Sequence, residues 1–375
     1  MVEILNNLSL SVTEYIVIGL LVFTCLTILY GYFRFFLKIR SADVDAANQL
    51  PGITVVVTSC NAARYLERFL PSVLEQDYPD YEVVVVDKYS YDDTERVLGH
   101  MKAKYERLKL TFVTEQTSFP DKMAYVLGAK AATKEWLIFI DGQTKVPGKN
   151  WLWDMARGMQ EGKDVVFGYG NVKYNRGFWN HLLRLQYSMR AMLCLSFSLN
   201  GLGCVYDTRN VALRKEAFFN SGVFSGMLNR KYADNELILQ GVLKKNNYSV
   251  ICTKNSIVSY DQYVDRREWQ ETIEKHLLLL RDYDLKQVIM MFLDGFLKVA
   301  FVGVFLVALL IPKLWLLAII MFSVKLLSQI ITYKLVQRHL GDKKILLSSL
   351  VCEVLFPVIY CGERVFIKLK RNNLS

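Results

Sequence analysis

The sequence predicts an α/β fold, built on a mostly parallel sheet and flanked by transmembrane helices at both ends. Two observations lead to this expectation. Short runs rich in β-branched residues recur between Ile53 and Asp141 with helix-like segments between them, which is the pattern of buried parallel strands in a β-α-β-α-β order. Long uncharged stretches lie on either side of this region, and 52% of the 375 residues are hydrophobic.

The central region, about residues 42–285, is long enough for a single α/β domain. Its strand-like runs end abruptly in polar residues, and Asn61, Asp87 and Asp141 fall at such ends. Ligands bind beyond the carboxyl ends of strands in an open parallel sheet, so these residues predict a site with two carboxylates. The predicted strands are 53–58, 82–87, 109–113, 136–141, 164–168 and 249–252, and the predicted helices begin near Ala63, Thr94, Lys122 and Trp151.

The first membrane segment is residues 15–37, which carry no charge before Arg34 and are long enough to span a bilayer. The stretch is too long for a signal peptide, and no small-residue cleavage site follows it. Arg34, Lys38 and Arg40 lie at its carboxyl end. The positive-inside rule then puts the amino terminus outside and the central domain in the cytoplasm, as in an integral protein of the inner or plasma membrane.

A carboxyl-terminal membrane region is predicted over residues 288–367. Two spans, about 288–311 and 314–337, form a hairpin around Pro312 and Lys313. The third segment, 345–367, is either a span or a re-entrant segment, because Glu353 and Glu363 disfavour a helix that faces lipid. Asp294 and Lys298 lie four residues apart, which places them on one helical face where they can pair.

The net charge of +10 excludes few classes of protein by itself. No basic stripe with interleaved aromatic residues indicates nucleic-acid binding, so nucleic acid is not an expected partner. Lysines and arginines instead flank the apolar stretches, where they face anionic lipid headgroups. The seven cysteines have no CxxC spacing, and the histidines form no cluster, so neither a disulfide framework nor a zinc site is expected.

Four stretches follow one another along the central region: LPSVLEQDYPDYEVVVVD, FPDKMAYVLGAKAATKEWLIFID, TRNVALRKEAFFNSGVF and YADNELILQGVLKKNNYSV. In their order and spacing they resemble family 2 glycosyltransferases of the GT-A fold, in a membrane-anchored form. The first belongs to the opening strand-helix-strand unit of that family and the second to its next unit, while the third is similar to the acceptor-side segment and the fourth to the helix that follows. The resemblance covers roughly residues 50–260. It implies a nucleotide-sugar donor and transfer to a lipid-linked or surface-glycan acceptor.

The resemblance also implies roles for donor-site residues. Thr58, Asn61 and Asp87 correspond to the positions that bind base and ribose, and Lys122 is a candidate for the phosphates. The departing diphosphate needs a divalent cation, Mn²⁺ or Mg²⁺, and hard cations prefer carboxylate and phosphate oxygens. Asp141 is the expected metal ligand.

On the acceptor side, Asp234 corresponds to the general base of an inverting transfer, which takes the proton of the acceptor hydroxyl. Without the other matches, the ADNEL stretch would more simply be the amino terminus of an ordinary helix with favourable acidic residues. Glu236 is expected to support Asp234, and Arg209 and Asn210 to line the acceptor side.

Two departures from the family pattern keep an alternative open. The DxD motif reads Asp141-Gly142-Gln143, so Gln143 offers only a neutral oxygen and weaker metal binding. Lys88 stands where many members have a base-contacting aspartate, and a cation cannot accept a proton from the base. Either the donor differs from the usual uridine nucleotide, or Lys88 points away and Asp87 or Asp92 contacts the base. A catalytically silent scaffold subunit on the same fold is the second hypothesis. A dinucleotide-binding dehydrogenase is excluded, because the first turn, TSCNAARY, lacks the required glycines.

Overall fold

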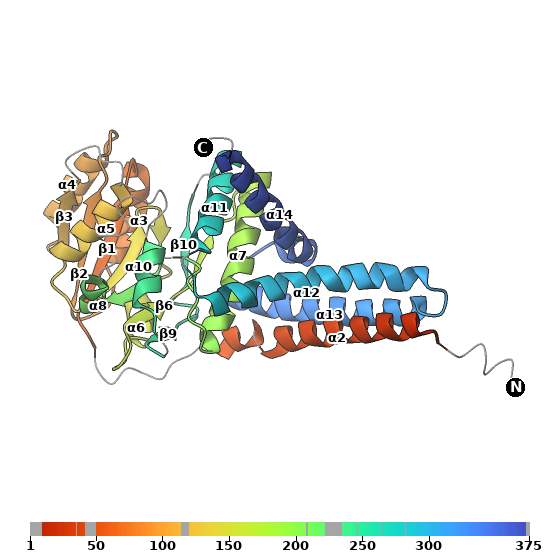
Figure 1. Cartoon of the computed structure of the whole chain (residues 1–375). Helices are drawn as coiled ribbons and strands as arrows, with labels where there is room; N and C mark the ends of the chain where they lie inside the picture. Colours follow the sequence, from red (N-terminus) through yellow and green to blue (C-terminus); the bar gives the residue numbers. More distant parts are fainter. Residues whose placement is uncertain are drawn as a thin grey trace, which may run out of the picture. The chain divides into compact units, whose positions relative to one another are not determined.

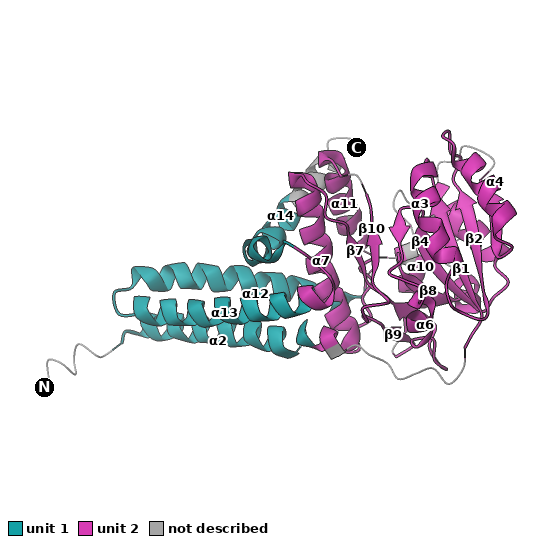
Figure 2. Ribbon diagram, turned by 180° about the vertical axis from the view of Figure 1, so that it is seen from behind, with its two compact units in different colours: residues 1–37, 284–336, 344–375 teal, residues 38–283, 337–343 magenta. Residues whose placement is uncertain are grey.

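The computed structural model describes residues 10–34, 36–41, 50–113, 120–207, 209–221, 235–244, 246–262, 264–281 and 283–372. The chain forms two compact units (Figure 2). Unit 1 comprises residues 1–37, 284–336 and 344–375, and unit 2 comprises residues 38–283 and 337–343.

A seven-stranded sheet forms the core of unit 2. Its strands are β1 (Ile53–Ser59), β2 (Tyr81–Asp87), β3 (Leu108–Phe112), β4 (Trp136–Asp141), β6 (Val165–Phe167), β8 (Val211–Arg214) and β9 (Tyr248–Val250). They lie in the order β3-β2-β1-β4-β8-β6-β9. The first four are parallel to one another, β8 is antiparallel to both of its neighbours, and β9 is parallel to β6. The predicted mostly parallel α/β sheet is confirmed.

Helices cover both faces of the parallel half of this sheet (Figure 1). Every residue of β1 and β2 is buried, as expected of strands covered on both sides. The odd-numbered valines of β1 and β2 pack with α3 (Ala63–Leu74) and α4 (Thr94–Lys104). On the other face lies α5 (Pro120–Ala131). A Cβ added at Gly128 of α5 would lie 2.3 Å from Cγ1 of Val56, so glycine is needed for this close approach.

Three of the four predicted helix starts match the first residues of α3, α4 and α6 (Trp151–Ala156), and α5 begins two residues before Lys122. The six predicted strands correspond to β1, β2, β3, β4, β6 and β9. The sequence patterns did not reveal the strands β5, β7, β8 and β10, because runs of two to four residues show no clear periodicity. A second sheet has the order β5-β10-β7. The additional elements are β5 (Thr144–Lys145), β7 (Gly170–Val172), β10 (Val258–Tyr260), α7 (Phe178–Leu199), α8 (Lys215–Asn220), α10 (Asn235–Val242) and α11 (Arg266–Leu279).

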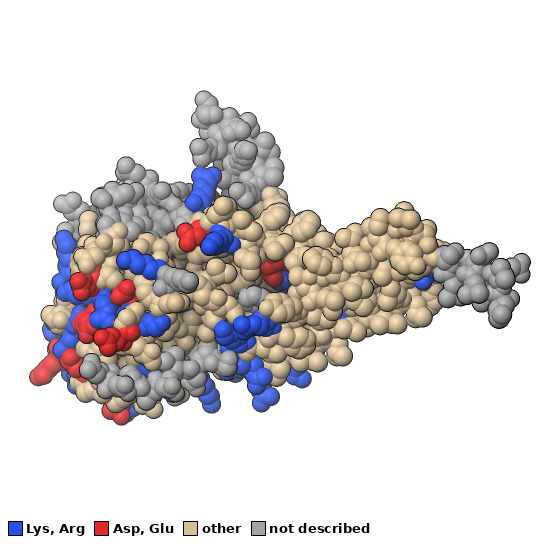
Figure 3. Space-filling model, turned by 60° about the horizontal axis from the view of Figure 1, so that its bottom comes forward, with Lys and Arg blue, Asp and Glu red and all other residues tan. Residues whose placement is uncertain are grey.

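Unit 1 is helical, and its long helices α2 (Val12–Arg34), α12 (Leu285–Leu310) and α13 (Trp315–His339) run alongside one another (Figure 1). Among the described residues, the segments Val12–Arg40, Leu285–Leu310 and Trp315–His339 are long and apolar enough to cross a membrane. Figure 3 shows few charged side chains on the visible surface of these helices. The fourth helix, α14 (Leu346–Asn372), has a shorter apolar part, Leu346–Gly362.

A cluster of charged side chains is buried inside unit 1. Lys298 Nζ lies 2.6 Å from Asp294 Oδ2, so the predicted pair on α12 is confirmed. Glu353 of α14 is fully buried and lies 3.2 Å from the amino groups of both Lys298 and Lys325. Tyr32 of α2 donates its hydroxyl to the same carboxylate. One carboxylate therefore joins α2, α12, α13 and α14.

Candidate active site

The candidate site lies at the carboxyl edge of three neighbouring parallel strands. Thr58 of β1 is in register with Asp141 of β4, and Ser59 of β1 is in register with Asp87 of β2. The two predicted carboxylates and Thr58 are thus brought together by strand pairing alone. This edge is where an open parallel sheet binds ligands.

Asp87 ties together the loops that follow β1 and β2. The hydroxyls of Ser59 and Ser90 donate to Oδ1 at 3.1 and 2.6 Å, and the backbone N–H of Ser90 donates to Oδ2 at 2.9 Å. The carboxylate is only 5% exposed. A carboxylate has about four lone-pair sites, so it retains capacity to accept from a ligand.

Asn61 fastens the same two loops from the other side. Its backbone N–H donates to Ser90 Oγ at 2.8 Å, and its Oδ1 accepts from the backbone N–H of Tyr91 at 2.9 Å. Its φ of 47° lies in the left-handed region, which asparagine tolerates better than most residues. The side chain remains exposed, so it is positioned by the loops and open to the site.

Lys88 forms an ion pair with Asp121, at the start of α5, at 2.5 Å. Burial would lower the pKa of Lys88, but Asp121 outweighs this effect and the pKa is raised. The lysine therefore stays charged with a carboxylate beside it, which balances the unusual cation after β2. Lys122, the next residue of α5, is 7% exposed.

Asp141 closes a tight turn after β4. Its Oδ1 accepts from the backbone N–H of Gln143 and from the hydroxyl of Thr144, both at 2.9 Å. Its side chain is 29% exposed. Among the described residues, no group of three or more His, Cys, Asp or Glu could hold a metal ion. Asp141 and the Gln143 amide oxygen are the oxygen groups of this turn that could hold a hard cation such as Mg²⁺, together with oxygens from a ligand.

Comparison with known proteins finds a family match for just under half of the chain. Residues 54–234 match the family model described as glycosyl transferase family 2. These residues belong to a family 2 glycosyltransferase domain. The predicted resemblance to family 2 glycosyltransferases is confirmed for these residues.

Relatives of the glycosyltransferase domain come from archaea and bacteria. Glycosyltransferase AglE of Haloferax volcanii is 30% identical over 129 residues, which are 33% of this chain and 40% of that protein. A GalNAc(5)-diNAcBac-PP-undecaprenol beta-1,3-glucosyltransferase of Campylobacter jejuni is 27% identical over 119 residues, covering 32% of this chain and 38% of that protein. The matches thus span less than half the length of these curated relatives.

A solved structure shares the fold of the glycosyltransferase. Mannosyltransferase PcManGT from Pyrobaculum calidifontis, in complex with GDP-Man and Mn²⁺, aligns with a TM-score of 0.55 at 19% identity. The alignment covers 91% of this chain and 98% of that chain. The common GT-A fold confirms the predicted fold class.

Arg209 reaches the candidate site of the glycosyltransferase from the segment before β8. Its guanidinium binds Asp207 through Nε and Nη2 at about 3.0–3.3 Å, and Nη1 lies 3.5 Å from Asp141 Oδ2. The hydroxyl of Tyr187 on α7 accepts from Nη2 at 2.6 Å, and the guanidinium lies over the Tyr260 ring at 4.0 Å. Burial by itself would lower the pKa of Arg209. The negative charge of Asp207, followed by Tyr187 and Asp141, outweighs this effect, so the pKa is raised.

The other residues that the sequence predicted for the acceptor side, Asn210, Glu236 and Asp234, do not share the surroundings of Arg209. Asn210 is fully buried, and its amide bonds the Trp151 indole and the backbone carbonyls of Tyr169 and Ser256. Its observed contacts are those of a framework residue, not of a group that lines an open site. Glu236 is buried near the start of α10, 3.0 Å from Lys275 Nζ. Asp234 lies outside the described residues.

Sequence reasoning missed three residues of this site, namely Asp207, Tyr187 and Tyr260. Asp207 comes directly before the TRNVALRKEAFFNSGVF stretch, two residues ahead of Arg209. An aspartate so close to an arginine that precedes a strand could have indicated that the two side chains pair. Tyr187 and Tyr260 gave no local signal. Gly170 makes room for Tyr260, because a Cβ there would lie 2.0 Å from the tyrosine hydroxyl.

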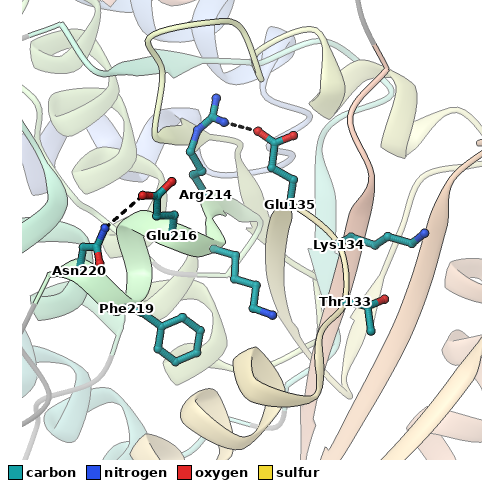
Figure 4. A pocket seen from close by; sticks show the side chains of 8 residues that line it. Thr133, Lys134, Glu135, Arg214, Glu216, Phe219 and Asn220 are labelled. Atoms are coloured by element: carbon teal, nitrogen blue, oxygen red, sulfur yellow. Dashed lines mark hydrogen bonds and ion pairs between the residues drawn. The ribbon is translucent and has the colours of Figure 1, made fainter.

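A separate pocket of about 730 Å³ lies where β4 begins and β8 ends, at the opposite end of β4 from Asp141 (Figure 4). Its cations already have partners. Arg214 pairs with Glu135, Lys134 pairs with Asp80, and Lys215 donates to a backbone carbonyl. This pocket is therefore not assigned to the reaction.

Proposed function

We propose that the chain is a membrane-bound glycosyltransferase that moves a sugar from a nucleotide-sugar donor to a lipid-linked or surface-glycan acceptor. The observation that supports this most directly is the alignment of Thr58, Asp87 and Asp141 along one edge of adjacent parallel strands. A donor needs hydrogen-bonding groups for its base and ribose and a charged region for its diphosphate. The edge offers both within one sheet.

The donor is expected to lie across the loops after β1 and β2. Asp87 and Asn61 hold these loops together through Ser90 and Tyr91, so the positions of base and ribose contacts are set before the donor binds. Such preorganisation reduces the entropy lost on binding. Lys122, at the start of α5, would approach the phosphates.

A divalent cation, Mn²⁺ or Mg²⁺, would be held by Asp141, with Gln143 as a weak neutral ligand. When bound, it would offset the charge that develops on the leaving diphosphate. Asp141 is kept in place by Gln143 N–H and the Thr144 hydroxyl, which leaves Oδ2 facing the site.

Acceptor activation is assigned to Asp234, which immediately precedes α10. The carboxylate would take the proton of the acceptor hydroxyl while that oxygen attacks the sugar from the face opposite the leaving group, so the transfer inverts the anomeric centre. Glu236, buried against Lys275 within the first turn of α10, would anchor that turn.

The three apolar helices support an enzyme that works at a lipid surface. Arg34, Lys38 and Arg40 follow the first of them, so the positive-inside rule favours a catalytic domain on the cytoplasmic side. Lipid-linked acceptors present their head groups to such a domain, and anionic membrane lipids would contact the basic residues.

Calorimetric titration with a panel of nucleotide sugars, each with and without Mn²⁺ or Mg²⁺, tests the donor site. Metal-dependent binding of one donor that is lost in Asp141→Ala is the expected result. If folded protein binds nothing across the panel, the silent scaffold becomes the better hypothesis. Lys88 and Gln143, the two departures from the family pattern, are the residues that favour it.

A second experiment tests the base. Asp234→Asn removes a proton acceptor without removing a donor contact, so we expect transfer to fall at least about 100-fold while donor affinity stays within a factor of two. Turnover is measured by release of nucleoside diphosphate, and donor binding by calorimetry. A variant that keeps most of its turnover would show that another group takes the proton.

A further inference from the structure

Arg209 lies opposite the metal-binding aspartate because of the pairing of β4 with β8. These strands are antiparallel, and Phe139 pairs with Val211. Two residues further along, the same register places Asp141 across from Arg209. The backbone N–H of Asn210 also donates to the carbonyl of Phe139, which extends the pairing towards the site. The approach of this guanidinium to Asp141 is therefore built into the sheet.

The two ends of the guanidinium are held very differently. Nε and Nη2 bind Asp207 and the Tyr187 hydroxyl at 2.6–3.3 Å, and the plane rests on the Tyr260 ring. Nη1 contacts Asp141 at 3.5 Å, the longest of these distances and the limit of a hydrogen bond. One end is thus anchored, while the end that faces Asp141 can exchange partners without moving the rest.

We propose that Arg209 is the counter-ion of Asp141 before the donor binds, and that its Nη1 end turns to the donor diphosphate when a divalent cation takes Asp141. This rests on the proposed function, because it assigns a residue to the diphosphate of the same donor. The positive charge compensates for Gln143, where a second carboxylate would otherwise help to hold the cation and, through it, the diphosphate. Guanidinium groups bind phosphate oxygens strongly and in fixed geometry.

This exchange predicts two effects of opposite sign when Arg209 is replaced. Arg209→Gln removes a cation that competes for Asp141, so Mn²⁺ alone should bind roughly 3- to 10-fold more tightly, in keeping with a weak, partly screened ion pair. The same variant loses a charge-assisted hydrogen bond to the diphosphate, so nucleoside diphosphate should bind roughly 10- to 100-fold more weakly. Damage to the fold would instead weaken the binding of both Mn²⁺ and nucleoside diphosphate.

The measurement uses the full chain in detergent. Free Mn²⁺ is quantified by electron paramagnetic resonance without nucleotide, and UDP and GDP are titrated by calorimetry in the presence of Mn²⁺. Arg209→Lys keeps the positive charge but loses the planar guanidinium group with its several N–H donors. It should therefore retain wild-type Mn²⁺ affinity and show an intermediate loss of nucleotide affinity. Arg214→Gln removes a partly buried arginine from the other end of β8 and should change neither quantity.

Mn²⁺ binding that is unchanged or weaker in Arg209→Gln would overturn the counter-ion role. Nucleotide binding that is unchanged would overturn the diphosphate role. The gain in Mn²⁺ affinity must also vanish in the double variant Arg209→Gln with Asp141→Asn, since the gain acts through Asp141. If wild-type protein binds neither nucleotide nor any donor of the calorimetric panel, the proposed function and the diphosphate role fail together, while the Mn²⁺ measurement still decides the counter-ion role.

Discussion

Replacement of Glu353 by glutamine should loosen the helical unit strongly. The carboxylate is fully buried and contacts the amino groups of Lys298 and Lys325 at 3.2 Å each. Together with Asp294, the four charges balance, so Glu353→Gln leaves one uncompensated positive charge inside the helix bundle. Breaking a buried ion pair by removing one partner costs about 3–5 kcal/mol.

Thermal unfolding of the full chain in detergent tests this magnitude. Unit 1 lies in size between small domains and domains of 150–250 residues, so a loss of about 3–5 kcal/mol corresponds to a fall of roughly 10–20 °C in Tm. Labelling of thiols with maleimide locates the change. Cys352 is buried next to Glu353 on α14 and should become reactive, whereas Cys361 on the same helix is already exposed and serves as the internal control.

A double variant separates charge from packing. Glu353→Gln combined with Lys325→Gln restores a neutral cluster, so it should recover a large part of the lost stability. If the single variant is as stable as wild type, or if the two changes simply add, the carboxylate does not stabilise the unit by balancing these lysines. Tyr32, which donates to Glu353 at 2.7 and 2.8 Å, would retain an acceptor in both variants.

Two further predictions concern the glycosyltransferase domain. Gln143→Asp adds a second carboxylate two residues from Asp141 and should raise Mn²⁺ affinity at least about tenfold by calorimetry; no gain would mean that Gln143 does not face the cation. Burial would raise the pKa of Glu82, but hydrogen bonds from Lys109, Thr133 and Thr54 lower it to about 2. Because this folded pKa lies below the unfolded value, the stabilisation is present above about pH 4.5 and is lost as the pH falls towards 2. In chemical unfolding, the free energy of unfolding of wild type should therefore exceed that of Glu82→Gln by about 2 kcal/mol at pH 7 and by less at pH 3. A gap that is the same at both pH values would contradict this origin.

The sequence determined the parallel half of the sheet and the place of the site. Uninterrupted β-branched runs are a local signal, and a strand buried on both faces requires them. Parallel strands end at a common edge, so the polar residues that follow them must meet. Asp87 and Asp141 could therefore be placed together from the chain alone, and the apolar helices could be recognised from their length and composition.

Apart from the local pair of Asp294 and Lys298, only the tertiary structure decided which charged groups pair. Arg209 meets Asp141 because β8 runs antiparallel to β4 in one register, and Glu353 meets two lysines because three helices converge on it. Lys88 similarly finds Asp121, 33 residues away. Hydrophobic periodicity is read within a few residues, whereas an ion pair depends on register and packing between distant segments. The sequence by itself thus located the site, and the fold assigned its electrostatic partners.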